Sequence, residues 1–311
     1  MKLLLTGAYA YSKDQIAIIK ELGYDLFFHD DVQQLMDYSL AKSIELVICN
    51  AFFKFNRLER FESLKFIQVT SAGLDRLPLE EIQKRQVTLA NARDVYSIPI
   101  SEWVILKVLE IYKNTRFFEF NQHKHLWVEN EDILELYGKT LGIMGYGSIG
   151  KEVAKRAQSF GVKIICLDKI HSSDPLVEQW YKIDQLDSFL AKSDIVVLAL
   201  PLTNETKNLF DKRRINLMKR GSVLINVSRG GIIDETALLK HLKEGNLRGA
   251  ALDVFESEPL EYNSPLWDEE RLLITPHNSF VSERVKARMF DLIIKNLQLF
   301  KKGLKPVNSI F

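Results

Sequence analysis

Cysteine is scarce in this sequence, with only two among 311 residues. Cys49 lies in the apolar run IELVICN and Cys166 in VKIICLD, and both runs are typical of buried strands. We therefore expect two buried free thiols instead of a disulfide, which indicates a reducing compartment. The histidines fit no zinc site, because His123 and His125 lack a partner carboxylate or cysteine pair. We expect these two side chains to be exposed and no metal to be bound.

Long hydrophobic runs are also missing. The start, MKLLLTGAYAYSKDQ, holds too short an apolar run for a signal peptide, and no stretch approaches the roughly 18 apolar residues of a membrane span. The formal net charge is only +1, which gives no support for a surface that binds nucleic acid or a membrane. The basic residues at 211–220 are expected on a solvated helix face. The sequence thus predicts a soluble, cytoplasmic protein without such partners.

The first hundred residues alternate short apolar runs with amphipathic stretches, and repeats and low-complexity tracts are absent. Strands are expected at residues 2–6, 24–29, 44–49, 66–70 and 87–90. Between the first two lies SKDQIAIIKELG, which begins at a capping residue, Ser12, and ends at Gly23. This alternation predicts a parallel sheet with helices on both faces.

A second series of the same kind follows a long helix, which is expected over residues 97–118 with Ser97 as its cap and Pro99 in its first turn. Residues 121–136 are polar and predict an arm or loop. The later strands are expected at residues 141–144, 162–167, 195–200, 223–227, 250–254 and 272–275, before a closing helix over 282–302 that Gly303 ends. The fold class is therefore α/β, with two doubly wound parallel-sheet domains, as the length also suggests.

The stretch LGIMGYGSIGKEVA matches two phosphate-binding patterns. A nucleoside-triphosphate loop needs Ser or Thr after its lysine to bind magnesium, but Glu152 stands there and would repel the phosphates. The dinucleotide pattern G-x-G-x-x-G is met in full, with a strand before it and a helix after it. Gly145 would make the tight turn, Gly147 would let the backbone approach the pyrophosphate, and Gly150 would let helix and strand pack closely.

The next strand ends in Asp168, where the dinucleotide pattern expects an acid. Its carboxylate would bind the adenosine ribose and repel a 2′-phosphate, which favours NAD over NADP, although Lys169 and His171 weaken this preference slightly. The amino end of the helix favours the pyrophosphate anion. The residues expected to contact the cofactor in the glycine loop are Gly145, Tyr146, Gly147, Ser148, Ile149 and Gly150.

Three later strands end in polar or charged residues, in LINVSRGGIIDETAL, GAALDVFESEPL and LLITPHNSF. Because ligands bind at the carboxyl edge of an open α/β sheet, we expect Arg229, Glu258 and His277 to converge. Singly they could be a turn arginine, a surface acid and a satisfied histidine. Together they suit the reduction of a 2-keto acid: a histidine can carry the proton, a carboxylate can orient its ring, and a guanidinium can bind the substrate carboxylate and polarise the ketone.

The ordered set GYGSIG, VSRGGIIDE, DVFESEPL and TPHNS resembles the D-isomer-specific 2-hydroxyacid dehydrogenases, over essentially the whole chain. The resemblance implies hydride transfer between NAD and a D-2-hydroxy acid or its 2-keto acid. It implies that Arg229 binds the substrate, that Glu258 supports His277 and that His277 is the acid/base. It also implies cofactor contacts by Asp253, at the nicotinamide carboxamide, and by Leu200, Pro201, Thr206, Val227, Ser228, Arg229, His277 and Ser279.

The resemblance further implies an inserted architecture. A flavodoxin-like substrate-binding domain would consist of residues 1–98 and 280–311, and a Rossmann NAD-binding domain, residues 99–279, would be inserted into it. The cleft would lie between the domains, with hinges near Ile98 and Phe280. The family commonly forms two-fold dimers through the NAD domain, and residues 121–137 would be the contacting arm.

In the first domain, the resemblance implies a carboxylate-binding loop, TSAGLDRLP, in which the backbone amides of Ser71, Ala72 and Gly73 hold the anion. Two departures from the family concern the substrate side. ARDVY at residues 92–96 replaces a loop of small residues, and Asn278 and Phe280 replace small residues after the histidine. They predict a narrower or more polar pocket.

Two other functions fit parts of this pattern. An NAD(H)-sensing, corepressor-like binding protein of the same fold can keep Arg229, Glu258 and His277, but the lack of long disordered flanks argues against it. A methyltransferase also uses a glycine-rich Rossmann loop, but the acid-bearing strand and the three later motifs weigh against that reading. An assay of NADH oxidation with a panel of 2-keto acids distinguishes the dehydrogenase from both of these functions.

Overall fold

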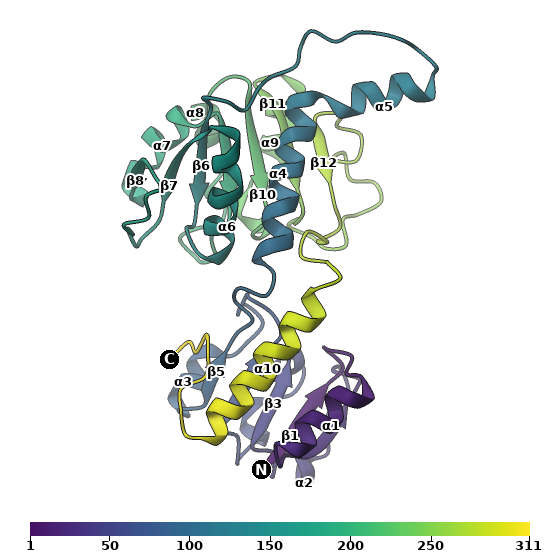
Figure 1. Cartoon of the computed structure of the whole chain (residues 1–311), viewed down its shortest axis with the longest axis vertical. Coiled ribbons are helices and arrows are strands. Elements are labelled where there is room, and N and C mark those ends of the chain that lie inside the picture. Colours follow the sequence, from purple (N-terminus) through teal and green to yellow (C-terminus); the bar gives the residue numbers. More distant parts are fainter. The chain divides into compact units, whose positions relative to one another are not determined.

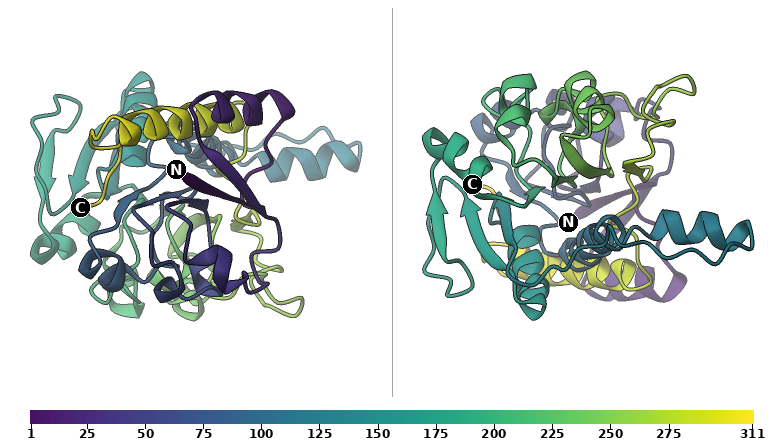
Figure 2. Two further views of the ribbon diagram at one scale, coloured as in Figure 1. Left: turned by 90° about the horizontal axis from the view of Figure 1, so that it is seen from below. Right: turned by 90° about the horizontal axis from the view of Figure 1, so that it is seen from above.

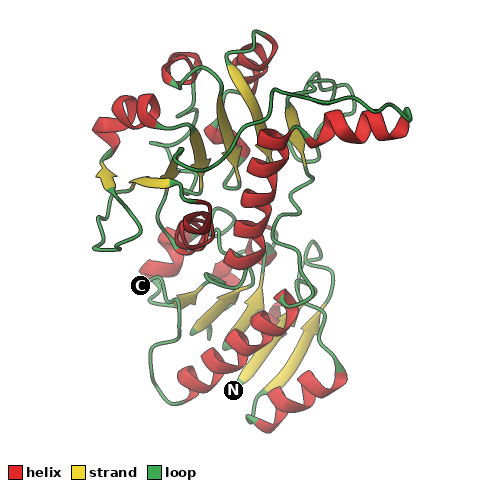
Figure 3. Cartoon of the chain, turned by 45° about the horizontal axis from the view of Figure 1, so that its top comes forward, coloured by secondary structure: helices red, strands yellow, loops and turns green.

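The structure, a computed structural model, describes residues 1–311 and divides them into two compact units (Figure 1). The first unit is Met1–Tyr96 together with Ser282–Phe311, and the second is Ser97–Val281. Each unit has its own parallel sheet with helices on its faces (Figure 3). The expected α/β class with two parallel sheets is therefore confirmed.

The first unit has a five-stranded sheet in the order β2-β1-β3-β4-β5, which is a doubly wound, flavodoxin-like order. Its strands are β1 (Lys2–Thr6), β2 (Asp25–His29), β3 (Leu46–Cys49), β4 (Phe66–Val69) and β5 (Thr88–Ala90). Its helices are α1 (Lys13–Glu21), α2 (Tyr38–Ala41), α3 (Leu79–Lys84) and α10 (Val285–Lys301). All five strands lie where the sequence predicts them, and the Ser12 side chain caps α1 as expected.

Alternate residues of these strands face opposite sides of the sheet, and each side is covered by helices (Figure 2). Leu3, Leu5 and Ile48 face α1 and α10, whereas Leu4 and Val47 face the side of α2 and α3. The closing helix α10 is thus part of the first unit although it comes from the other end of the chain. Two polar contacts fix it there: the Tyr24 hydroxyl donates to the Leu297 carbonyl, and Asn296 Nδ2 donates to Gln68 Oε1 at 2.6 Å.

The second unit has a seven-stranded sheet in the order β12-β11-β10-β9-β6-β7-β8. Its strands are β6 (Thr140–Met144), β7 (Lys163–Leu167), β8 (Gln179–Tyr181), β9 (Ile195–Leu198), β10 (Ser222–Asn226), β11 (Leu247–Leu252) and β12 (Leu272–Ile274). Its helices are α4 (Ser97–Lys113), α5 (Thr115–His123), α6 (Ser148–Ala157), α7 (Leu186–Lys192), α8 (Lys212–Leu217) and α9 (Glu235–Lys243). The strand order reverses between β6 and β9, and the carboxyl ends of strands at such a switch point are where ligands bind.

The second unit departs from the sequence prediction in two places. The helix expected to continue to residue 118 breaks at Asn114, which adopts a left-handed conformation (φ 50°), so that α5 is a separate helix. The predicted arm is therefore helical as far as His123 and irregular after it. The short edge strand β8 was not predicted, because its three residues, QWY, carry no periodic pattern.

Several other predictions are confirmed. Cys49 and Cys166 are free and buried, and His123 and His125 are exposed. The basic residues around α8 are largely exposed, as predicted, while Ile215 on the opposite face of the helix is buried. No helix combines the length and the apolar content that crossing a bilayer requires.

Candidate active site

The glycine loop joins β6 to α6, and two of its three glycines have a steric reason within the chain. Gly145 has a positive φ of 93°, and a Cβ there would lie 2.6 Å from the Ala199 carbonyl oxygen. A Cβ on Gly150 would lie 2.3 Å from the Gly145 carbonyl oxygen, so helix and turn pack directly on each other. At Gly147 the space is open, and no side chain caps α6. The first amides of α6 are thus available to an anion in that space.

Asp168 lies against this loop. Its Oδ2 accepts from the Tyr146 amide at 2.6 Å, and its Oδ1 accepts from the Ile170 amide at 2.9 Å. A carboxylate beside an open, uncapped helix end is the arrangement that a dinucleotide requires, so these residues fit an NAD(P) cofactor. The neighbouring cation, Lys169, is already paired with an acid. Its Nζ lies 2.7 Å from Glu205 Oε2, and both side chains are exposed.

The sequence analysis did not predict an aromatic cluster that Tyr146 of the glycine loop forms with His171 and Trp180. The Tyr146 ring packs edge-on against Trp180 of β8, with ring centroids 5.1 Å apart, and His171 lies 5.7 Å from the same indole. Burial is the main cause that raises the pKa of the Tyr146 hydroxyl, and the nearby Asp174 carboxylate adds to the effect. The only sequence signal was the tryptophan of the short strand β8, which is why the cluster was missed.

The loop after β9 is closed by its own hydrogen bonds. The buried Thr206 hydroxyl donates to the Pro201 carbonyl at 2.7 Å and accepts from the Thr203 amide at 2.7 Å. Leu200 packs against the core of the unit, while Pro201 is exposed. Thr206 therefore sets the shape of the loop, and Pro201 lies on its accessible side.

The Arg229 turn follows β10 and is held by a residue that the sequence analysis did not single out. Asn226 is fully buried, and its Oδ1 accepts from both the amide and the hydroxyl of Ser228, at 3.0 and 2.7 Å. Its Nδ2 donates to the Arg229 carbonyl at 3.0 Å. The buried Val227 continues the turn, since its amide donates to the Leu198 carbonyl. The strand end is thereby folded into one fixed shape that presents Arg229.

Gly230 brings this turn into direct contact with the turn that follows β11. A Cβ on Gly230 would lie only 1.8 Å from the Phe255 carbonyl carbon and 2.2 Å from the Glu256 nitrogen. No side chain fits there, because real Cβ atoms do not approach backbone so closely. The backbone that carries Arg229 therefore rests on the backbone that leads to Glu258.

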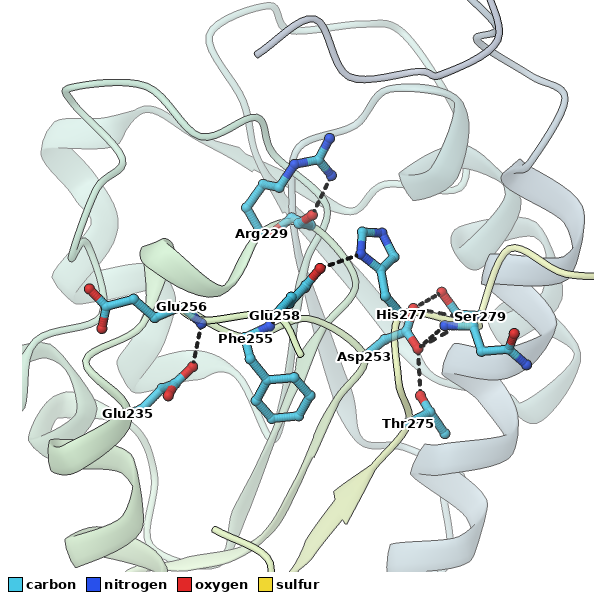
Figure 4. A network of polar contacts seen from close by, with 11 residues as sticks. Arg229, Glu235, Asp253, Phe255, Glu256, Glu258, Thr275, His277 and Ser279 are labelled. Atoms are coloured by element: carbon cyan, nitrogen blue, oxygen red, sulfur yellow. Dashed lines mark hydrogen bonds and ion pairs between the residues drawn. The ribbon is translucent and has the colours of Figure 1, made fainter. Parts of the chain in front are cut away.

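Glu258 and His277 are paired as the sequence predicts. His277 Nδ1 lies 2.9 Å from Glu258 Oε2, and Glu258 Oε1 accepts from the Phe255 amide at 3.1 Å. Both side chains are about one-third exposed, at 35%. Figure 4 shows the Glu258 carboxylate pointing at the imidazole, with the Arg229 guanidinium on the same side of the network. The strand ends thus bring the three predicted residues into one site.

Asp253 fixes the loop that carries His277. The carboxylate is 1% exposed and accepts from four donor groups: the Thr275 hydroxyl, the Asn278 amide, and the amide and hydroxyl of Ser279, at 2.5 to 3.1 Å. The His277 amide donates to the Asp253 carbonyl at 2.8 Å. His277 itself has a φ of 51°, a conformation that residues other than glycine seldom adopt. This set of bonds holds the histidine in that conformation (Figure 4).

The loop predicted to bind a carboxylate lies in the first unit, after β4. Its carbonyls are occupied: that of Ser71 accepts from the Ala92 amide, that of Ala72 from Asn91 Nδ2 at 2.8 Å, and that of Gly73 from the Ser71 hydroxyl at 2.8 Å. The three backbone amides donate no hydrogen bond within the chain. They are available to an external acceptor, as an anion-binding nest requires.

The contact at Gly230 gives a matched pair of substitutions. Gly230→Ala should lower the free energy of unfolding by about 2 kcal/mol or more, because its Cβ must displace backbone. Gly231→Ala is the control: its Cβ would meet only the Leu202 side chain, at 3.6 Å, and should change stability by less than about 0.5 kcal/mol. Urea denaturation of both variants measures the difference. Equal stabilities would contradict the packing described here.

Comparisons with known proteins identify the family of this chain. The family described as D-isomer specific 2-hydroxyacid dehydrogenase, NAD binding domain, matches residues 105–279. A glyoxylate reductase of Pyrococcus horikoshii is 35% identical over 259 residues, which cover 80% of this chain and 76% of that protein. A glycerate dehydrogenase of Methylorubrum extorquens is 33% identical over 262 residues, 81% of each protein.

Solved structures extend the likeness to the whole chain. A D-isomer specific 2-hydroxyacid dehydrogenase family protein from Aeromonas salmonicida has a TM-score of 0.84 and 30% identity, and covers 100% of this chain and 98% of that chain. A D-lactate dehydrogenase from Aquifex aeolicus, complexed with NAD and lactic acid, has a TM-score of 0.82 and 26% identity, and covers 99% of this chain and 98% of that chain. This chain therefore belongs to the D-isomer specific 2-hydroxyacid dehydrogenases, and it is an NAD(P)-dependent oxidoreductase of 2-hydroxy acids.

Proposed function

We propose that this chain reduces a small 2-keto acid to the D-2-hydroxy acid, with His277 as the acid/base. The observation that carries the proposal is the 2.9 Å contact between His277 Nδ1 and Glu258 Oε2. Because Nδ1 is engaged by a carboxylate, the proton exchanged with the substrate must be carried on Nε2. The relatives are named for glyoxylate and glycerate, so we expect a substrate of that size.

Arg229 of the second unit is proposed to bind the substrate, and the Ser71–Gly73 amides of the first unit are proposed as a carboxylate-binding loop. A guanidinium forms two parallel hydrogen bonds with a carboxylate and can polarise the neighbouring ketone, and the free amides offer a second set of donors. The bound cofactor supplies the hydride. We assign substrate binding to residues 1–98 and 280–311 and cofactor binding to residues 99–279, in accordance with the family match to residues 105–279.

We propose NAD as the preferred cofactor. Asp168 would accept hydrogen bonds from the ribose and repel a 2′-phosphate, and the nearby cation Lys169 is paired with Glu205. A relative from Xanthobacter autotrophicus was solved with NADPH, at 25% identity, so the choice varies among the neighbours of this chain. Further contacts with the cofactor are proposed for the glycine loop and for Leu200, Pro201, Thr206, Val227, Ser228, Asp253 and Ser279.

The arm residues 121–137 are proposed as a contact between two copies of the chain. Helix α5 and the segment after it project from the second unit (Figure 1), and a cavity of about 590 Å³ lies between them. The arm exposes large apolar side chains, and Trp127 is 99% exposed. A contiguous apolar surface of this kind is typical of an interface.

The reaction is tested with NADH and a panel of small 2-keto acids that begins with glyoxylate. We expect NADH oxidation with at least one of them, and His277→Ala should lose about 100-fold or more of kcat while it still binds NADH. Binding of NADH can be followed separately by its fluorescence. If no 2-keto acid supports oxidation while NADH still binds, a corepressor-like binding protein becomes the better description.

The Glu258–His277 pair is tested by pH profiles. Reduction needs protonated His277 and oxidation needs the neutral ring, and Glu258→Gln removes the charge that favours protonation. The alkaline limb of the reduction profile and the acid limb of the oxidation profile should both move to lower pH. Glu256→Gln, an exposed neighbour, is the control and should leave both limbs in place. Unmoved limbs in Glu258→Gln would disprove the coupling.

The cofactor preference is tested at Asp168. Wild-type protein should have the higher kcat/KM with NADH, and Asp168→Ala should raise the ratio of kcat/KM with NADPH to kcat/KM with NADH by about tenfold or more, because a repelling charge and its ribose hydrogen bonding are lost. Steady-state kinetics with both cofactors measure the ratio. A wild-type preference for NADPH would refute the role given to this carboxylate.

The proposed dimer is tested by sedimentation. The wild type should have about twice the chain mass of 35.9 kDa, and Trp127→Glu should shift the protein towards the monomer, since it puts a charge into the apolar contact. Tyr262→Glu is the control, because Tyr262 is equally exposed, at 101%, but lies outside the arm. A monomeric wild type, or equal shifts in both variants, would count against the arm as the interface.

A further inference from the structure

Glu235 is the first residue of α9 and is half-buried behind the two turns of the site. Its Oε1 accepts from the Glu256 amide at 2.7 Å, as Figure 4 shows. Nothing in the sequence motifs assigns it a role, because it follows the Arg229 turn as an ordinary acid in the first turn of a helix. Its partner, however, is not in its own helix but in the turn that carries Glu258.

That turn is held from three directions. The Phe255 amide donates to Glu258 Oε1 at 3.1 Å from inside the turn, and the next amide, of Glu256, donates to Glu235 from outside. On a third side the backbone rests on Gly230, where no Cβ fits. Because Glu258 uses one oxygen for the Phe255 amide and the other for His277, its orientation depends on where the turn lies.

The charged form of a carboxylate is disfavoured at the position of Glu235. Burial raises the pKa of Glu235, and the nearby Glu256 carboxylate raises it further, while the amide hydrogen bond opposes both. The acidic groups around the turn are the carboxylates of Glu235, Glu256 and Glu258, of which Glu258 points at the His277 imidazole while Glu235 and Glu256 point away from it (Figure 4). The contact of Glu235 with the turn is a hydrogen bond from a backbone amide, so the acceptor oxygen, and not the charge, is what ties Glu235 to the turn.

We propose that Glu235 is a positioning residue for the acid/base pair: through the Glu256 amide it fixes the turn that presents Glu258 to His277. The proposal rests on the proposed function of that pair. It differs from an electrostatic role, because an uncharged acceptor of the same length would serve equally well. It also differs from a purely structural role, because its loss changes how readily His277 is protonated during turnover.

Three substitutions separate hydrogen bonding from charge. Glu235→Gln removes the charge but keeps an acceptor oxygen at the same reach, so the alkaline limb of the reduction profile should stay in place. Glu235→Asp keeps the charge but shortens the side chain, and Glu235→Ala removes both. Both of these should lower kcat/KM by about tenfold, the scale of one unsatisfied amide, and move the limb to lower pH, as Glu258→Gln does. NADH binding should be unchanged in all three.

The outcomes are distinguishable. Movement of the limb in Glu235→Ala and Glu235→Asp, but not in Glu235→Gln, supports the proposal. Equal movement in Glu235→Gln and Glu235→Ala overturns it in favour of a charge effect, and a loss of thermal stability with an unmoved limb overturns it in favour of a structural role. If Glu235→Ala does not fold, the comparison of Glu235→Asp with Glu235→Gln decides. An unmoved limb in Glu258→Gln would instead refute the proposed function of the pair.

Discussion

The carboxylate of Asp253 is the interaction on which the site depends. It is buried at the end of β11 and gathers the hydroxyls and amides of the loop that carries His277. A histidine with a positive φ is disfavoured by sterics and persists only when its surroundings determine it. These bonds fix the loop on both sides of the histidine, so the position of the acid/base is set by a buried carboxylate that is itself not expected to exchange the proton.

Close backbone contact is the second constraint, and it explains the glycines better than flexibility does. Gly150 and Gly230 each lie where a Cβ would collide with backbone, at the nucleotide loop and between the Arg229 and Glu258 turns. The contact at Gly230 joins the turns after β10 and β11 into one body. The geometry between guanidinium and carboxylate therefore does not rely on direct contact between their side chains.

Much of this could be predicted from the sequence, because the signals are local. Short apolar runs gave the strands of both sheets except β8, the spacing of Gly145, Gly147 and Gly150 gave the nucleotide loop, and the rule that ligands bind at strand ends brought three distant residues together. The roles of the individual site residues stay predictions. The family assignment, which rested on four ordered motifs, is confirmed.

What could not be predicted depends on contacts between distant segments. Asn226 and Glu235 look like an ordinary strand-end amide and helix-start acid until the structure shows which amides they hold. The reason for Gly230 is a peptide group more than twenty residues away along the chain. The break at Asn114 was not predicted, because helical residues lie on both sides of it and a single left-handed residue does not change the hydrophobic pattern.

The return of α10 to the first unit has a consequence for synthesis of the chain. Met289, Ile293 and Leu297 cover a face of the sheet formed by β1, β3 and β4, which are made first. Since chains emerge from the ribosome in order, this apolar face is covered only in part, by α1, until Ser282–Phe311 are released. The inserted unit, Ser97–Val281, is contiguous and has all its strands before then. The nascent protein must therefore protect a sheet whose five strands are present but whose covering helix α10 is still missing.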